Sequence, residues 1–121
     1  MISVKVDPVR QRIDLVADQE VGEADMQRIL AEVTAGVRLM RPGWIMTNDF
    51  RGQALISPKL DPYIAAVQKA VLAGAPRKIA TLVDSQLLKM QLSVSSVATR
   101  SGDLTQRFDN EQAWRAFIEA P

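Results

Sequence analysis

The sequence predicts one α/β domain with a mixed, mostly parallel five-stranded sheet, its elements running strand, strand, helix and then strand–helix three times. Short apolar runs alternate with longer stretches of helical periodicity, a pattern typical of strand–helix units in a parallel sheet. Two alternating segments come first with no helix between them, which adds an antiparallel hairpin. A length of 121 residues suits a single hydrophobic core, so we expect one domain over residues 1–121.

The first two strands are expected at residues 2–6 and 12–18. Apolar side chains take every second position in both, at Ile2, Val4 and Val6 and again at Ile13, Leu15 and Ala17. This period of two indicates strands with one buried face. Asp7 and Pro8 supply the turn between them. We therefore expect a hairpin at the margin of the sheet.

The first helix is expected over residues 24–40. Apolar residues recur there at helical spacing, at Met26, Ile29, Leu30, Val33, Val37 and Met40. A Pro-Gly pair at 42–43 ends the helix. The next run, residues 44–47, is apolar on both faces and leads into polar Asn48 and Asp49, which predicts a central strand.

The second helix follows a loop over residues 51–60 and has two candidate N-caps, Ser57 and Asp61, each followed by proline. Its predicted buried stripe consists of Leu60, Ile64, Val67 and Val71. Gly74 ends the helix, and the apolar run at residues 79–83 predicts a second central strand.

The third helix is expected from about Gln86. Its predicted buried face carries Leu87, Met90, Val94 and Val97. A short strand at residues 104–108 follows, covered on one face. Asp109 and Gln112 form a variant of the capping box that opens the last helix. That helix is expected to bury Ala113, Trp114, Phe117 and Ile118.

Composition excludes several classes of function. The chain has no Cys and no His, which rules out disulfides, thiol or imidazole catalysis, haem ligation and Cys/His zinc sites. Lys and Arg number 15 against 14 Asp and Glu without clustering, so no nucleic-acid partner is expected. Charges interrupt every apolar run. We therefore expect a cytoplasmic protein without membrane insertion, cofactor or enzymatic activity.

The candidate partner or ligand surface lies at the carboxyl ends of the two central strands. Asp49 follows one strand and Asp84 and Ser85 follow the other, so a parallel sheet brings them to one edge. Two carboxylates there can hold a divalent cation or act as acid and base. We favour local roles instead, with Asp84 or Ser85 capping the third helix and Asp49 closing a turn, and assign no catalytic or metal-binding residue.

The loop after Asp49 adds Phe50 and Arg51 to this surface. Leu55 and Ile56 are interpreted as residues that plug the core under the second helix. A loop with this many bulky apolar residues either folds back on the core or faces a partner, because ordinary surface loops are mostly polar.

The far face of the sheet is a second candidate for an interface. If the helices cover mainly one face, Trp44 or Met46 lies on the other, and an apolar patch there favours homodimerisation. A pocket between sheet and helices is a further expectation. It would be made adaptable by the methionines Met1, Met26, Met40, Met46 and Met90.

Two stretches carry a resemblance to a known family. The third strand running into Asp49-Phe50-Arg51 looks like a family strand that ends in an Asp-Leu-Ser type sequence, and Arg107-Phe108-Asp109-Asn110-Glu111-Gln112-Ala113 is similar to the family's last strand and helix entry. Together with the order of elements, they make the whole chain resemble the STAS domain family. This family is shared by sulfate transporters and bacterial anti-sigma factor antagonists, and the chain is most similar to its stand-alone soluble members. The resemblance implies the STAS fold and regulation through protein–protein contacts.

In the antagonists, the segment after this strand ends in Asp-Ser at the start of the second helix, and a partner kinase phosphorylates the serine. Counting forward from Asp49 without gaps puts Ser57 on that Asp and Pro58 on that Ser, so the acceptor is missing. Ser57 is the neighbouring candidate for phosphorylation. We favour its other role, a helix N-cap.

Two functions follow as expectations. The first is a non-catalytic module that binds a protein partner or a second copy of itself through residues 49–59 and the second helix. The alternative is a small-molecule binding protein that holds an apolar or anionic ligand between the sheet edge and the second or third helix.

Overall fold

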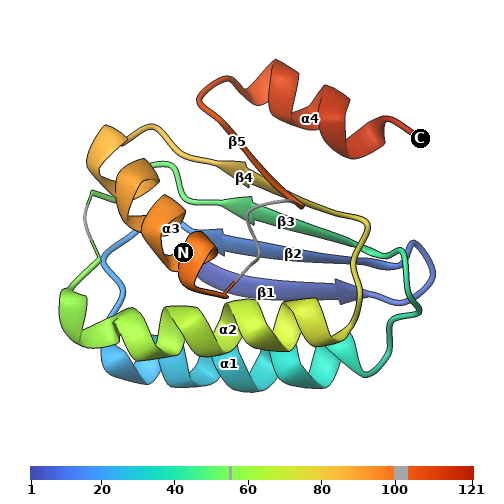
Figure 1. Ribbon diagram of the computed structural model, residues 1–121, viewed down its shortest axis with the longest axis horizontal. Coiled ribbons are helices and arrows are strands. Elements are labelled where there is room, and N and C mark those ends of the chain that lie inside the picture. Colours follow the sequence, from blue (N-terminus) through green and yellow to red (C-terminus); the bar gives the residue numbers. More distant parts are fainter. Residues whose placement is uncertain (55, 100–103) are drawn as a thin grey trace.

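The computed structural model describes residues 1–54, 56–99 and 104–121, with the backbone alone for 95–99. Over these residues it confirms an α/β fold with a mixed five-stranded sheet and four α-helices (Figure 1). The elements are, in order, β1 (Ile2–Asp7), β2 (Arg12–Ala17), α1 (Glu23–Val37), β3 (Ile45–Asp49), the 3₁₀ helix η1 (Pro58–Leu60), α2 (Asp61–Ala73), β4 (Lys78–Leu82), α3 (Gln86–Thr99), β5 (Thr105–Phe108) and α4 (Glu111–Glu119).

The sheet has the strand order β1-β2-β3-β4-β5. β1 pairs with β2 in antiparallel fashion, and the pairs β2–β3, β3–β4 and β4–β5 are parallel. Asp49 lies opposite Leu82, which puts the carboxyl ends of β3 and β4 at the same edge. The parallel section therefore brings Asp49 and Asp84 to one edge, as the sequence predicts.

Helices cover both faces of the sheet unequally. Successive strand residues point to opposite faces, and in β4 Ile79 packs into the core under α1, α2 and α3, while Ala80 packs against Trp114 and Ile118 of α4. Figure 1 shows α1 and α2 side by side along the sheet and α4 apart from them, near β4 and β5. β4 is thus covered on both faces, whereas β5 has no fully buried residue and an exposed Gln106, in keeping with the expected half-covered strand.

The expected apolar patch on the far face is absent from the described residues. Trp44 and Met46 are 1% and 2% exposed and belong to the core under the helices. The face of β2 and β3 that points away from α1 and α2 is mostly polar instead: Arg12 Nε lies 2.7 Å from Asp14 Oδ1, and the Thr47 hydroxyl donates to the same carboxylate. This face gives no support to an apolar homodimer interface.

α3 turns a different side to the core from the one the sequence predicts. Leu88 and Leu92 are buried, whereas Leu87, Met90 and Val94 are 59%, 64% and 72% exposed. Val97 lies among the residues whose side chains are not described. The helix carries leucines on two neighbouring faces, and the pattern alone cannot tell which of them meets the sheet.

Of three helix-end predictions, those for Asp109 and Asp61 need correction and that for Ser57 is confirmed. Asn110 has an extended backbone, and its side-chain oxygen caps α4 by accepting from the Ala113 N–H at 2.9 Å. Asp109 therefore precedes the cap. Ala113, expected to be buried, is exposed. Asp61 lies inside the first turn of α2, because η1 runs directly into that helix. Ser57 takes the cap of η1.

Gly74 ends α2 for a reason other than backbone freedom. Its φ is −84°, but a Cβ at this position would lie 2.6 Å from Val37 Cγ1 and 2.9 Å from Trp44 Nε1. The Trp44 indole N–H donates to the Gly74 carbonyl at 2.9 Å. Glycine therefore allows α1, the start of β3 and the end of α2 to meet closely.

Lys78 fixes the end of α4 to the sheet. Its ammonium donates to the carbonyls of Phe117 and Ala120, the latter at 2.7 Å, and lies 4.8 Å from the centre of the Phe117 ring. Carbonyls at a helix C-terminus attract a cation. Burial lowers the pKa of Lys78. This anchor holds α4 against β4, where its first turn reaches the candidate site.

Candidate functional site

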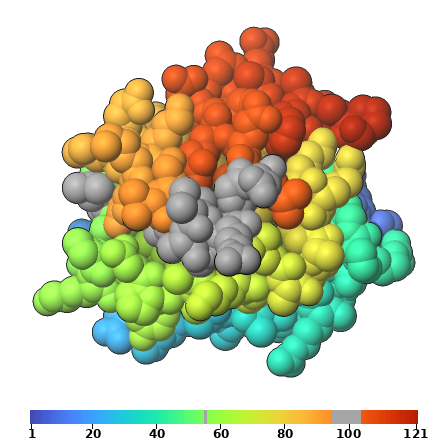
Figure 2. Space-filling view, viewed as in Figure 1, coloured from blue at the N-terminus to red at the C-terminus, as the bar shows by residue number. Residues whose placement is uncertain are grey.

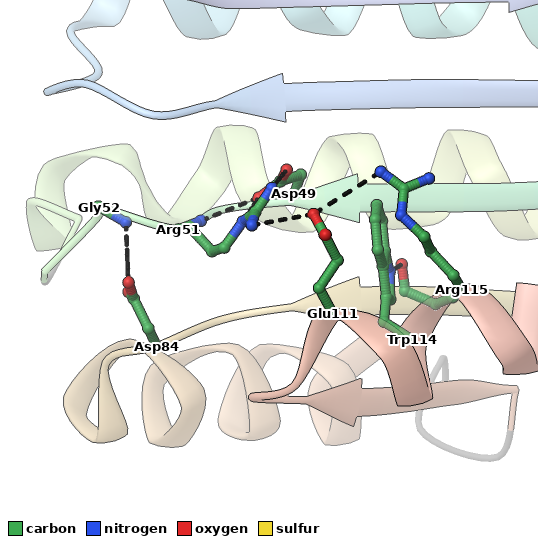
Figure 3. A network of polar contacts seen from close by, with 8 residues as sticks. Asp49, Arg51, Gly52, Asp84, Glu111, Trp114 and Arg115 are labelled. Atoms are coloured by element: carbon green, nitrogen blue, oxygen red, sulfur yellow. Dashed lines mark hydrogen bonds and ion pairs between the residues drawn. The ribbon is translucent and has the colours of Figure 1, made fainter.

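The candidate site lies where β3 and β4 end. The Phe50 N–H donates to the Leu82 carbonyl at 2.9 Å, which continues the strand pairing beyond Asp49. The chain then turns at Gly52, whose φ of +86° suits glycine, and its N–H points at Asp84 Oδ1, 3.2 Å away (Figure 3). Asp84 therefore holds the loop after β3 rather than capping α3.

Asp49 and Arg51 form a two-pronged ion pair at this edge. Arg51 Nη2 lies 2.7 Å from Asp49 Oδ2, and Arg51 Nε lies 3.0 Å from Asp49 Oδ1. The Arg51 backbone N–H adds a third bond of 3.2 Å, so Asp49 also closes the predicted turn. Hydrogen bonds from Arg51 lower the pKa of Asp49, and the carboxylate in turn raises the pKa of Arg51.

A third charged group extends the pair to α4. Arg51 Nη1 lies 3.0 Å from Glu111 Oε1, which also receives Arg115 Nη2 at 3.6 Å (Figure 3). The four side chains join the end of β3 to the first turn of α4. Sequence reasoning identified Asp49 and Arg51 but missed Glu111 and Arg115, since nothing in the local pattern signals an ion pair between segments so far apart.

The ion pair predicts a pH dependence. We expect Arg51→Gln to lower the free energy of unfolding by less than about 1 kcal/mol near neutral pH, because Arg51 is 45% exposed and solvent screens the pair. The pKa of Asp49 is lowered from 3.8 in the folded state, so the pair stabilises the fold above pH 3.8 and this contribution is lost as the pH falls through the folded pKa.

The measurement is urea unfolding of wild type and variant at about pH 7 and about pH 3. The difference between the two proteins should shrink at the lower pH. Arg10→Gln is the control, because Arg10 is 78% exposed and its nitrogen lies 3.8 Å from Asp7. An Arg51→Gln effect of equal size at both pH values would contradict this assignment.

Both serines of the predicted surface act as caps. Ser85 Oγ accepts from the Leu88 N–H at 3.2 Å at the start of α3, and Ser57 Oγ accepts from the Lys59 N–H at 3.4 Å at the start of η1. The favoured local role is therefore confirmed for both. Ser57 is exposed, and its phosphorylation stays a prediction.

Gln91 fastens the loop to α3. Its side-chain carbonyl accepts from the Ile56 N–H at 3.0 Å, and its amide donates to the Ile56 carbonyl at 2.7 Å. Ile56 is buried as predicted, whereas Leu55 lies outside the described residues. Phe50 packs against the core and does not extend toward solvent with Arg51. These two bonds join the loop to the first half of α3.

Three apolar side chains stand out on the surface of α3. Leu87, Met90 and Val94 lie three and four positions apart on α3, so they share one helix face, and each is more than half exposed. We call these three residues the α3 stripe. Figure 2 shows the first half of α3, in orange, on the molecular surface above the start of α2. Leucine and methionine are among the residues most often buried, so a stripe of them in solvent is unusual.

A cavity of about 90 Å³ lies between the sheet and helices α1, α2 and α3, where the sequence analysis places a pocket. Its apolar wall includes Leu15, Met26, Met46, Ile64, Val71 and Leu92. Of the methionines expected there, Met26 and Met46 line it, Met40 packs elsewhere against the core, and Met1 and Met90 are exposed.

Comparison with protein-family models, curated proteins and solved structures found no match. Among the described residues, no cluster of three or more Asp or Glu side chains is arranged to hold a metal ion. In the same part of the chain, none of the helices is both long and apolar enough to cross a bilayer.

Proposed function

We propose that the chain is a non-catalytic, STAS-like interaction module that binds another protein through the α3 stripe and the adjoining loop of residues 49–60. The exposure of Leu87, Met90 and Val94 carries this proposal. The resemblance of Asp49–Arg51 and of residues 107–113 to STAS sequences supports it. A chain without cysteine also suits the reducing cytoplasm, where we place the protein.

The polar groups of the edge support a binding role over catalysis. Asp49 and Arg51 neutralise each other, Asp84 holds the Gly52 N–H, and Ser57 and Ser85 cap helices. Each of these groups already has a partner within the loop or at a helix end. These five side chains serve instead to hold the loop and the start of α3 in place, which preorganises the surface.

The chemistry of α3 indicates the kind of partner. Between Gln86 and Val94 the helix has one charged residue, Lys89. Apolar residues at positions i, i+3 and i+7 are the anchors with which a helix enters a hydrophobic groove. Three side chains offer only a few hundred Å², less than the roughly 800 Å² per partner of a stable interface. We therefore propose a different protein with an apolar groove, which surrounds the helix and also contacts the loop, in preference to a second copy.

A photo-crosslinking amino acid at position 90, introduced in the native host, tests the proposal. It should give one discrete adduct with another protein, and the same probe at Leu39 should not, although Leu39 is 58% exposed. With the captured protein purified, we expect Met90→Ser to weaken binding by about 30-fold, the effect of an interface hot spot, and Leu39→Ser to leave it unchanged.

Two results would count against this function. An adduct made only of two copies of the chain would replace the proposed partner by a homodimer. Equal affinities of the Met90→Ser and Leu39→Ser variants for the captured protein would show that α3 is not the contact surface.

A further inference from the structure

We propose that the cavity between the sheet and α1–α3 binds a small uncharged molecule with an apolar body and one hydroxyl or amide group. This inference is independent of the protein-binding surface, because the α3 stripe points to solvent and the cavity lies on the core side of the helices. It depends on two buried polar side chains in the cavity wall, Asn48 and Thr81.

Asn48 and Thr81 lie opposite each other on β3 and β4, with exposures of 9% and 3%. Asn48 Nδ2 donates to Thr81 Oγ1 at 3.1 Å. This bond uses the hydroxyl oxygen as an acceptor, so the Thr81 proton is left to donate, and the Asn48 carbonyl is left to accept. In the part of the chain that the structure describes, no second hydrogen bond of either side chain is found.

The pair therefore presents a donor and an acceptor side by side in an apolar wall. Buried polar groups almost always find partners, and an unused donor and acceptor next to a cavity indicate a binding role. One ligand hydroxyl can accept from Thr81 and donate to Asn48 at the same time. A carboxamide offers the same two functions.

The walls define the rest of the ligand. Residues of all three helices and of the sheet contribute aliphatic carbon, among them Ile29, Ile64, Val67, Val71 and Leu92. An engineered aliphatic cavity of about 150 Å³ in another protein stays dry and takes up benzene. A cavity of about 90 Å³ exceeds the room that one water needs and, at about three-fifths of the volume of that engineered cavity, suits a body of roughly four heavy atoms.

The polar pair itself favours a neutral ligand, because neither Asn48 nor Thr81 carries a charge that could pair with an anion. Among the described lining residues Arg107 is the charged one, and its Nη2 already donates to the Leu92 carbonyl at 3.2 Å. Moving a carboxylate from water into an aliphatic wall is costly unless it is paired. A neutral hydroxyl avoids this cost and still forms hydrogen bonds with both Asn48 and Thr81.

2-Propanol, 2-chloropropane and acetate are three probes of matched size, about four heavy atoms each, that separate these properties. We propose titrating each into the full chain and following backbone amide shifts of residues 46–48 and 79–81. 2-Propanol should bind about tenfold more tightly than 2-chloropropane, the net value of its hydrogen bonds to Thr81 and Asn48, and acetate more weakly than either. Thr81→Val, which keeps the side-chain shape but removes one of the two bonds, should lower this preference. Thr34→Val, a half-buried threonine of α1 outside the lining, should preserve the tenfold preference.

Three results would overturn the inference. Equal binding of 2-propanol and 2-chloropropane to the unchanged protein would remove the role of Asn48 and Thr81, and this comparison needs no variant to fold. Acetate binding best would assign an anionic ligand. No saturable shift with 2-propanol or 2-chloropropane would leave a cavity filled by water or by neighbouring side chains.

Discussion

Trp44→Ala is expected to lower the free energy of unfolding by about 3–5 kcal/mol, the range found when a large buried aromatic side chain is truncated. Trp44 is 1% exposed, and its indole joins three elements at the point where α1, β3 and α2 meet. The substitution leaves a large void and also removes the donor of the Gly74 carbonyl. Gly74, which the indole contacts, has no side chain that could move into the space.

Urea unfolding followed by circular dichroism measures this loss. Trp44→Phe separates the packing contribution from the hydrogen-bond contribution, because phenylalanine retains most of the volume but cannot donate to the Gly74 carbonyl. We expect this variant to lower the free energy of unfolding by roughly 1–3 kcal/mol. Val9→Ala is the exposed control, since Val9 is 92% exposed, and should change stability by less than about 0.5 kcal/mol. A Trp44→Ala variant within 1 kcal/mol of wild type would contradict the packing described here.

Sequence patterns predict the sheet and the position of its polar edge well, and the reason is physical. The alternation of apolar and polar residues in β2 and the apolar run of β4 reflect which faces of each strand are buried. The sequence itself carries this information. Met26, Ile29 and Val33 are buried in α1 as the 3.6-residue period predicts. Asp49 and Asp84 share an edge because parallel strands must end together.

Prediction fails where two local solutions are nearly equal. Asp109 and Asn110 are both good cap residues, and the end of β5 at Phe108 decides between them. In α3, Leu87 and Leu88 are adjacent and belong to different apolar faces. Only tertiary packing selects the face with Leu88 for the core.

The candidate site shows the same limit. The role of Asp49 as a turn residue follows from its neighbours, but its link through Arg51 to Glu111 joins segments that the fold alone brings together. The bonds from Gln91 to Ile56 have no sequence signal either, since a glutamine in a helix is normally a solvated residue.

Leu88→Ala is the second substitution with a large expected effect. Leu88 is 0% exposed and packs in the core under α3, so its truncation should cost about 2–5 kcal/mol. The cost arises from lost burial and from the cavity left behind, since leucine and alanine are both good helix formers. Ser85, which caps α3 through the N–H of residue 88, is unaffected because that bond uses the backbone.

Comparing Leu88→Ala with Leu87→Ala in urea unfolding tests the central claim most directly, because the claim requires that α3 turns Leu87, Met90 and Val94 away from the core. Leu87 is 59% exposed, and Leu87→Ala should cost less than about 0.5 kcal/mol. The account predicts a large loss at position 88 and almost none at position 87. A loss at position 87 equal to or greater than that at 88 would place the stripe in the core and remove the proposed binding surface.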